Sequence, residues 1–242
     1  MKIEVSHRTD IGCVRQMNED ALFIDPHCRV FIVADGMGGH NAGDVASRIA
    51  CDFISRALTL ESGGIEPAAP EEFLKRSVEQ AHEEILRRSR EEPECEGMGT
   101  TVEVLWLTEG HALWAHVGDS RIYRIRNGRM QQLTRDHSLI NEHIQLGLLN
   151  PEDARQSPLR HVILQALGAR GKVEVETGSE TCHPGDLFLL CSDGLTDAVR
   201  DEELARILLS TGDLEVAARN AVEMARQMGG PDNISLILIR LS

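Results

Sequence analysis

The sequence contains few aromatic residues and few residues that carry positive charge. Phe, Trp and Tyr make up 3% of the 242 residues, so we expect a core built mainly from Leu, Ile, Val and Ala. Lys and Arg number 25 against 39 Asp and Glu, which gives a formal net charge of −14. A chain with this charge repels nucleic acids and anionic lipid surfaces, so the composition argues against both as partners.

Paired cysteines and long apolar runs are also missing. The six cysteines are scattered and include no C-x-x-C pair. This pattern is typical of reduced thiols rather than of a disulfide framework or a structural zinc site. Residues 1–5 form no apolar signal region, and no run approaches the roughly 20 apolar residues that cross a bilayer. We therefore expect a cytoplasmic protein that is not inserted in a membrane.

Length and hydrophobic pattern predict one domain of the α+β class. Continuous apolar runs near 30–34 and 186–192 predict buried strands. Short segments between 100 and 134, with a turn at Asn127-Gly128, predict one antiparallel sheet, with Asp119 between two of its strands. Apolar residues at helical spacing predict helices over about 43–59, 71–90, 201–209 and 213–228, and the more polar segment 136–170 predicts helical fragments near 140–146 and 151–155. Because helices and strands do not alternate one for one, an antiparallel β-sandwich with helix pairs on its outer faces fits better than a doubly wound parallel sheet.

Aspartate recurs in glycine-rich turns and where predicted strands end. The positions are Asp20, Asp35, Asp119, Asp193 and Asp232. Several carboxylates in one pocket repel each other unless a cation neutralises them, and an all-oxygen set favours magnesium, manganese or calcium. A single Asp-Gly turn is more often purely structural, so spacing alone suggests a metal site without proving one.

Seven short motifs follow one another along the chain. They read GCVRQMNED (12–20), VADGMGGH (33–40), GTT (99–101), GDSR (118–121), LTRDHS (133–138), SDGL (192–195) and DNI (232–234). In this order, and over about residues 6–240, they resemble the type 2C metal-dependent protein phosphatases, in particular the compact bacterial branch. The resemblance implies a four-layer α-β-β-α fold in a single catalytic domain, residues 1–242, with a flap subdomain at about 136–170.

The same resemblance implies the chemistry and the residues that perform it. It implies hydrolysis of phosphoserine and phosphothreonine on proteins by metal-activated water at a two-metal centre, with manganese or magnesium and without a phosphoenzyme. The implied ligands of the two core ions are Asp20, Asp35 (bridging), the Gly36 carbonyl, Asp193 and Asp232, with Glu19 acting through a water. Asp119 would share a third, weaker ion with Asp193, and Arg15 would bind the phosphate.

The sequence leaves the roles of Arg15 and His40 open. Arg15 could be an ordinary surface arginine, and His40 could either donate a proton to the leaving group or form a hydrogen bond at the rim of the site. We expect Asn233 to fix the turn that holds Asp232, and His137 and Ser138 to be structural.

The flap sequence departs from the family pattern. It reads Gln156-Ser157-Pro158-Leu159-Arg160 where the family often has a His-Pro pair, which puts specificity in doubt but not chemistry. A pseudophosphatase that only binds phosphoproteins is disfavoured because no metal-ligand position is substituted, and a sensor-regulated phosphatase because no residues remain for a sensor domain. We expect phosphorylated proteins, substrates of a serine/threonine kinase, as partners of a monomeric enzyme.

Overall fold

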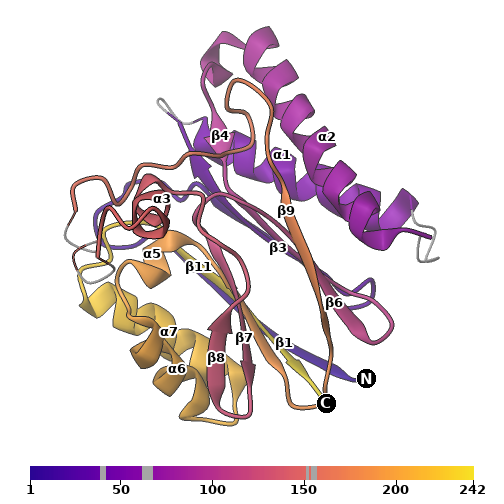
Figure 1. Ribbon diagram of the computed structural model, residues 1–242, viewed down its shortest axis with the longest axis vertical. Coiled ribbons are helices and arrows are strands. Elements are labelled where there is room, and N and C mark those ends of the chain that lie inside the picture. Colours follow the sequence, from indigo (N-terminus) through magenta and orange to yellow (C-terminus); the bar gives the residue numbers. More distant parts are fainter. Residues whose placement is uncertain (39–41, 62–67, 151–152, 154–156) are drawn as a thin grey trace.

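Two antiparallel β-sheets lie face to face at the centre of the protein, and helices cover both outer faces (Figure 1). The computed structural model describes residues 1–38, 42–61, 68–150, 153 and 157–242. Within these ranges no helix is long and apolar enough to cross a bilayer.

The first sheet has the strand order β1-β11-β10-β7-β8. Its strands are β1 (Ile3–Asp10), β11 (Ile234–Leu241), β10 (Leu187–Cys191), β7 (Arg121–Arg126) and β8 (Arg129–Gln132). The predicted hairpin turn joins β7 to β8, since Arg126 pairs with Arg129. Asn127 and Gly128 have φ angles of 52° and 73°, and two positive φ values are what a two-residue type I′ turn needs.

The second sheet has the order β2-β3-β5-β6-β9, with β4 paired to the end of β3. Its strands are β2 (Asp20–Asp25), β3 (Val30–Met37), β4 (Gly99–Thr100), β5 (Val102–Leu107), β6 (His111–Val117) and β9 (Glu176–Thr181). All residues of β5 are buried, because this strand lies between the other sheet and the helices. The pattern did not predict β2 or β9.

Two pairs of helices cover the sandwich. They are α1 (Gly43–Arg56), which continues into a short π-helix η1 (Ala57–Glu61), α2 (Pro70–Glu91), α6 (Asp201–Leu209) and α7 (Leu214–Gln227). Pro70 stands in the first turn of α2, where its missing N–H costs nothing. The Asp213 carboxylate caps α7 by accepting from the Glu215 and Val216 amides. These bounds confirm the four predicted helices to within a few residues.

Hydrophobic residues fill three layers between the four layers of structure. One layer lies between α1, α2 and the second sheet, one between the two sheets, and one between the first sheet and α6 and α7. Burial of apolar side chains in each layer stabilises the fold by about 25 cal/mol per Å² removed from water. The predicted α-β-β-α architecture is confirmed.

Two local predictions were wrong. Asp119 was expected between two strands of one sheet, but β6 belongs to the second sheet and β7 to the first, so the residue lies where the chain crosses between sheets. Asp193 was expected in a turn at the end of a buried strand, but it begins the short helix α5 (Asp193–Thr196).

The predicted flap follows β8. It contains α3 (Leu139–Gln145), whose first turn is capped by the Ser138 hydroxyl accepting from the Asn141 amide. A second helical fragment was predicted at 151–155, which lies outside the described residues except for position 153. A short 3-10 turn, η2 (Pro93–Cys95), ends the connection from α2.

Candidate metal centre

Four of the five predicted carboxylates reach one place because strands from both sheets end there. Asp20 begins β2 and pairs directly with Asp35 on β3. Asp193 follows β10 and Asp232 precedes β11, two neighbouring antiparallel strands of the other sheet. The Ser192 hydroxyl donates to Asp20 Oδ2 at 2.9 Å and so joins the two sheets at this edge.

The carboxylates interact strongly with one another. Burial, followed by Asp20 and Asp193, raises the pKa of Asp35 well above its usual value. Burial and then Asp119 likewise raise the pKa of Asp193. The pKa of Asp20 is raised to about 6, mainly by burial. A cation would relieve this repulsion and restore the ionised forms.

The donor set fits a hard divalent ion. Three of the carboxylates offer a buried oxygen that has no hydrogen-bond partner in the described part of the chain: Asp20 Oδ1, Asp119 Oδ1 and Asp193 Oδ1. Leaving a buried polar atom unpaired costs roughly 1–3 kcal/mol, so three such atoms on clustered carboxylates indicate a missing partner. Oxygen-only ligands are those that magnesium and manganese prefer.

Asp119 reaches the centre from the crossing between the sheets. Its side chain is buried, and burial followed by Asp136 and Asp197 raises its pKa to about 7. Asp119 raises the pKa of both Asp35 and Asp193, which places it within electrostatic range of these two carboxylates. The structure therefore brings all five predicted aspartates together.

Two threonines hold the backbone of Asp35 in place. The Asp35 carbonyl accepts from the Thr101 amide and the Thr100 hydroxyl, both at 2.9 Å. The Asp35 amide in turn donates to Thr101 Oγ1 at 3.1 Å. The sequence motif GTT thus has a physical role that spacing alone did not assign.

Gly36 and Glu19 pack against the start of α1. A Cβ on Gly36 would lie 2.2 Å from the Gly43 carbonyl oxygen and 2.6 Å from that of Glu19. The Gly36 amide donates to the Glu19 carbonyl at 3.2 Å. Burial raises the pKa of the Glu19 carboxyl. Both predicted residues therefore lie beside Asp35.

Asp232 contacts Arg15, and the next residue, Asn233, is held by hydrogen bonds to the backbone. Arg15 Nη2 donates to Asp232 Oδ2 at 2.7 Å, and about half of the arginine side chain is exposed (49%). Asn233 donates to the carbonyls of Ile11 and Met17 and accepts from the Glu19 amide. Asn233 thus ties the Arg15 loop to the Asp232 turn, as predicted for a structural residue.

A cleft of about 680 Å³ opens beside Asp119 and Asp193. Its walls include Ile140 and Ile144 of α3 and Arg160 of the flap. His40, the predicted proton donor, lies outside the described residues.

Two further residues at this cleft were missed by the sequence analysis. His161 and Asp197 form, with Asp193, a group whose candidate ligand atoms lie within 4.8 Å of one another. Asp197 stands four residues after Asp193, a helical spacing that could have indicated it. His161 carried no such signal, because only the fold of the flap brings it near, 3.4 Å from Asp197.

Comparisons with known proteins agree with this geometry. Residues 13–228 match the family model for protein phosphatase 2C. The serine/threonine phosphatase stp of Listeria innocua is 39% identical over 235 residues, which cover 96% of this chain and 93% of the relative. The structure of the Mycobacterium tuberculosis serine/threonine phosphatase PstP/Ppp matches with a TM-score of 0.92 and 33% identity over 99% of both chains.

A second similar structure contains metal ions. The catalytic domain of the serine/threonine protein phosphatase PstP, in complex with two manganese ions, matches with a TM-score of 0.88 and 32% identity over 99% of both chains. The fold, the carboxylate cluster and these matches lead to one assignment. The chain belongs to the protein phosphatase 2C family and is a metal-dependent serine/threonine protein phosphatase.

Proposed function

We propose that this phosphatase holds two ions, manganese or magnesium, and that the carboxylates of both sheets and the Gly36 carbonyl are their ligands. The proposed carboxylate ligands are Asp20, Asp35, Asp193 and Asp232, with Glu19 contributing through a water. The observation that carries the assignment is the convergence, from two sheets, of buried carboxylate oxygens that have no hydrogen-bond partner among the described residues. When bound, the ions lower the pKa of a water and stabilise charge on the phosphoryl group, so that water attacks phosphorus without a phosphoenzyme.

Arg15 is the proposed phosphate-binding residue. The Arg15 side chain is about half exposed, and its Nη2 donates to Asp232. A guanidinium has five N–H donors, so others remain to bind phosphate. A guanidinium can bind phosphate oxygens in a bidentate manner. The hydrogen bond to Asp232 orients Arg15 and keeps it beside the proposed ions.

Arg15→Ala should mainly raise the KM for a phosphopeptide, with a smaller loss in kcat. A charge-assisted hydrogen bond contributes about 1.5–3 kcal/mol, and part of it is already present in the ground state. Steady-state kinetics on a phosphopeptide and on para-nitrophenyl phosphate measure the effect, with Arg219→Ala on the exposed face of α7 as the matched control. Unchanged kinetics on both substrates would make Arg15 an ordinary surface residue.

A third, weaker ion is proposed at Asp119 and Asp193. The unpartnered Oδ1 atoms of both residues support it, and Asp197 and His161 are near enough to complete its surroundings. The proposed role of this ion is to help protonate the leaving serine or threonine oxygen, which needs a proton, whereas nitrophenolate does not.

Asp119→Ala should therefore slow a phosphoprotein substrate more than para-nitrophenyl phosphate at saturating manganese. The ratio of the two activities, wild type against variant, is the measurement. An equal loss on both substrates together with a lower melting temperature would assign Asp119 to the support of its turn alone.

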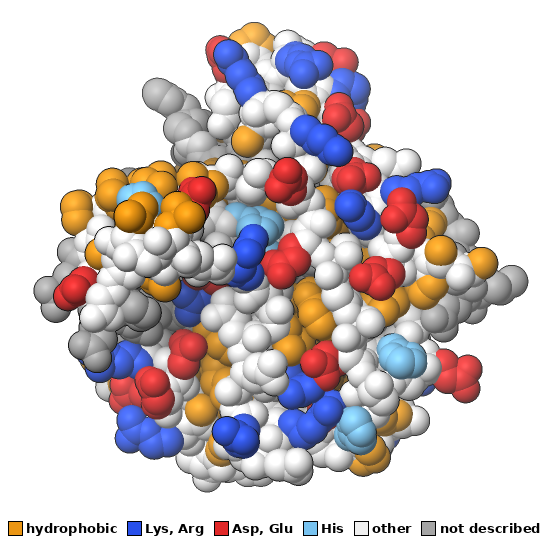
Figure 2. All heavy atoms as spheres, viewed as in Figure 1, with side chains coloured by type: hydrophobic (Ala, Val, Ile, Leu, Met, Phe, Trp, Pro, Cys, Tyr) orange, Lys and Arg blue, Asp and Glu red, His pale blue; other side chains and the backbone are white. Residues whose placement is uncertain are grey.

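The proposed substrates are proteins phosphorylated by a serine/threonine kinase. We propose that the enzyme is monomeric and acts in the cytoplasm. Hydrophobic side chains gather over α3 and the flap (Figure 2), and the most exposed are Leu146, Leu148 and Leu164. Apolar patches of this kind are typical of protein-contact surfaces, which supports substrate contact at the flap. Turnover of para-nitrophenyl phosphate and a phosphothreonine peptide with manganese tests the proposal, and binding without turnover would indicate a pseudophosphatase.

A further inference from the structure

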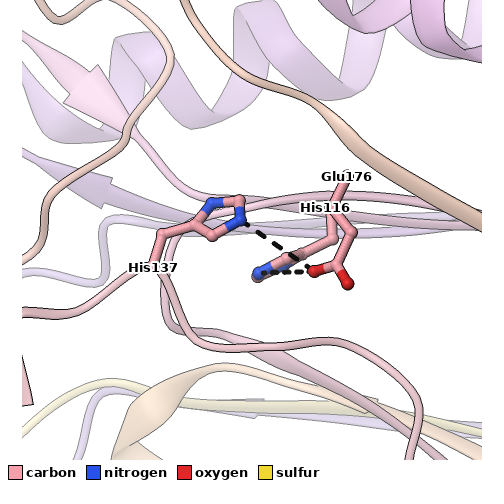
Figure 3. A group of neighbouring side chains, drawn as sticks. All are labelled: His116, His137 and Glu176. Carbon is pink, nitrogen blue, oxygen red and sulfur yellow. Dashed lines mark ion pairs between the residues drawn. The ribbon is translucent and has the colours of Figure 1, made fainter. Parts of the chain in front are cut away.

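A second group of ionisable side chains lies beneath the end of β6, outside the proposed ligands. His116 of β6 and Glu103 of β5 are fully buried, and His116 Nδ1 lies 2.5 Å from Glu103 Oε1. The His137 ring lies 4.5 Å from the His116 ring, measured between centroids. Nε2 of each histidine points toward Glu176 of β9, at 4.0 Å from His116 and 3.9 Å from His137 (Figure 3).

The hydrogen bonds of this group argue against a metal site of its own. His116 Nε2 lies 3.0 Å from the Arg135 carbonyl oxygen, so this nitrogen carries a proton. His137 Nδ1 accepts from the Gly118 amide at 3.2 Å, and burial lowers the pKa of His137 to about 4. A neutral ring whose Nδ1 accepts has its proton on Nε2. Because a ligating nitrogen must be free of its proton, neither Nε2 is available to a cation.

His137 instead holds the peptide groups on both sides of Gly118. Its ring accepts from the Gly118 amide, and its own amide donates to the Gly118 carbonyl at 2.6 Å. Gly118 has a φ of 121°, and a Cβ there would lie 2.5 Å from Thr101 Cγ2. Gly118, the residue that precedes Asp119, therefore has hydrogen bonds from both of its peptide groups to His137 and little room to move.

The surroundings keep His137 itself in place. Its carbonyl accepts from the Leu164 amide of the flap at 2.7 Å. His116, fixed between Glu103 and the Arg135 carbonyl, lies against its ring. The next residue back along the chain, Asp136, forms a bidentate ion pair with Arg121, two residues after Asp119: Arg121 Nε donates to Oδ1 and Nη2 to Oδ2. The residues on both sides of Asp119 are thus held by the segment that begins the flap.

We infer that His137 is a positioning residue for Asp119: it fixes the Gly118 peptide so that the Asp119 carboxylate is presented to the third ion, and it links that carboxylate to the flap. The inference rests on the proposed role of Asp119. Partners of metal ligands that do not touch the metal themselves typically contribute about 10–100-fold to metal affinity or activity. His137 acts in this way through the backbone rather than through a direct contact with the carboxylate.

Two amide substitutions at His137, one that keeps the hydrogen bond to Gly118 and one that loses it, separate this positioning role from a general effect on folding. In His137→Asn the side-chain oxygen takes the place of Nδ1 and can still accept from the Gly118 amide. In His137→Gln the oxygen lies one carbon further out and loses that position. His111→Gln, at the exposed start of β6, the strand that leads to Gly118, is the matched control.

Hydrogen exchange of residues 117–120, measured by mass spectrometry, is the readout that does not depend on activity. We expect faster exchange in His137→Gln, and exchange like that of the wild type in His137→Asn and in His111→Gln. Phosphopeptide turnover at saturating manganese should fall about 10–100-fold in His137→Gln and be largely retained in His137→Asn. In an Asp119→Ala background, His137→Gln should cause no further loss, since residues that act through one another are not additive.

Equal losses from His137→Gln in the wild-type and Asp119→Ala backgrounds would overturn the inference, and so would unchanged exchange at residues 117–120. If Asp119→Ala alone leaves turnover intact, the third-ion proposal fails, whereas the exchange data still decide whether His137 holds the turn.

Discussion

Asp193→Asn should lower phosphopeptide turnover by about two orders of magnitude or more, equivalent to about 2.7 kcal/mol of transition-state stabilisation. Asp193 is the residue that the proposed core centre and the proposed third ion share, and its Oδ1 is buried without a partner among the described residues. An amide keeps the shape of the side chain but removes the charge that attracts the cation. Steady-state kinetics at saturating manganese measure the loss, and turnover near that of the wild type would show that Asp193 is not a ligand.

The same substitution should stabilise the metal-free protein. Burial and the neighbouring carboxylates raise the pKa of Asp193 well above 3.8 in the folded chain. A carboxyl with a raised folded pKa supports the fold below its unfolded pKa and loses that contribution as the pH rises through the folded pKa. Asn has no such loss, so metal-free Asp193→Asn should melt above metal-free wild type, and the difference should grow as the pH rises from about 4.

Manganese should reverse this order. A ligand that binds only the folded state stabilises it in proportion to its affinity, and the wild type keeps the full set of carboxylates. Melting curves with and without manganese measure the crossover. A metal-free wild type that is more stable than the variant at pH 8 would contradict the repulsion on which the assignment depends.

Gly36→Ala should remove activity and destabilise the fold by about 3 kcal/mol or more, at the upper end of the usual cost of overpacking. The added methyl group would meet backbone atoms of Gly43 and Glu19, 2.2 Å and 2.6 Å away, which cannot move as a side chain can. Separating β3 from α1 would displace Asp35 and Glu19 together.

Gly212→Ala is the matched control for that change. A Cβ at Gly212 meets nothing within 4 Å, and its φ lies outside the range that strains other residues. Chemical denaturation and phosphopeptide turnover should therefore be unchanged in Gly212→Ala. If Gly36→Ala behaved like this control, the close packing of α1 against the Asp35 turn would have no part in building the site.

The strand ends that carry the proposed ligands were easier to predict from the sequence than the path of the chain through the sheets. Asp35 and Asp193 follow apolar runs that are recognisable as buried strands, so their position at strand ends could be predicted. Strand β9 could not, because its residues Glu176–Thr181 are polar and none of them is buried. Its pairing with β6 depends on the tertiary fold.

The crossing at Asp119 was mispredicted for a related reason. Strands β6 and β7 both carry apolar residues, and local pattern does not reveal whether consecutive strands pair or pass to opposite sheets. The role of His137 was equally invisible, because its contacts with Gly118 and Leu164 join residues 19 and 27 positions apart. Contacts of this kind follow from the fold and not from spacing.

We propose that turnover depends on a cation held by the carboxylates that come from both sheets. The most direct test is phosphate release from a phosphothreonine peptide by protein stripped with a chelator and then titrated with manganese, its metal content measured in parallel. We expect no turnover in the stripped wild type, recovery as manganese binds, and little recovery in Asp193→Asn. Full turnover by wild-type protein that contains no measurable manganese or magnesium would contradict the account.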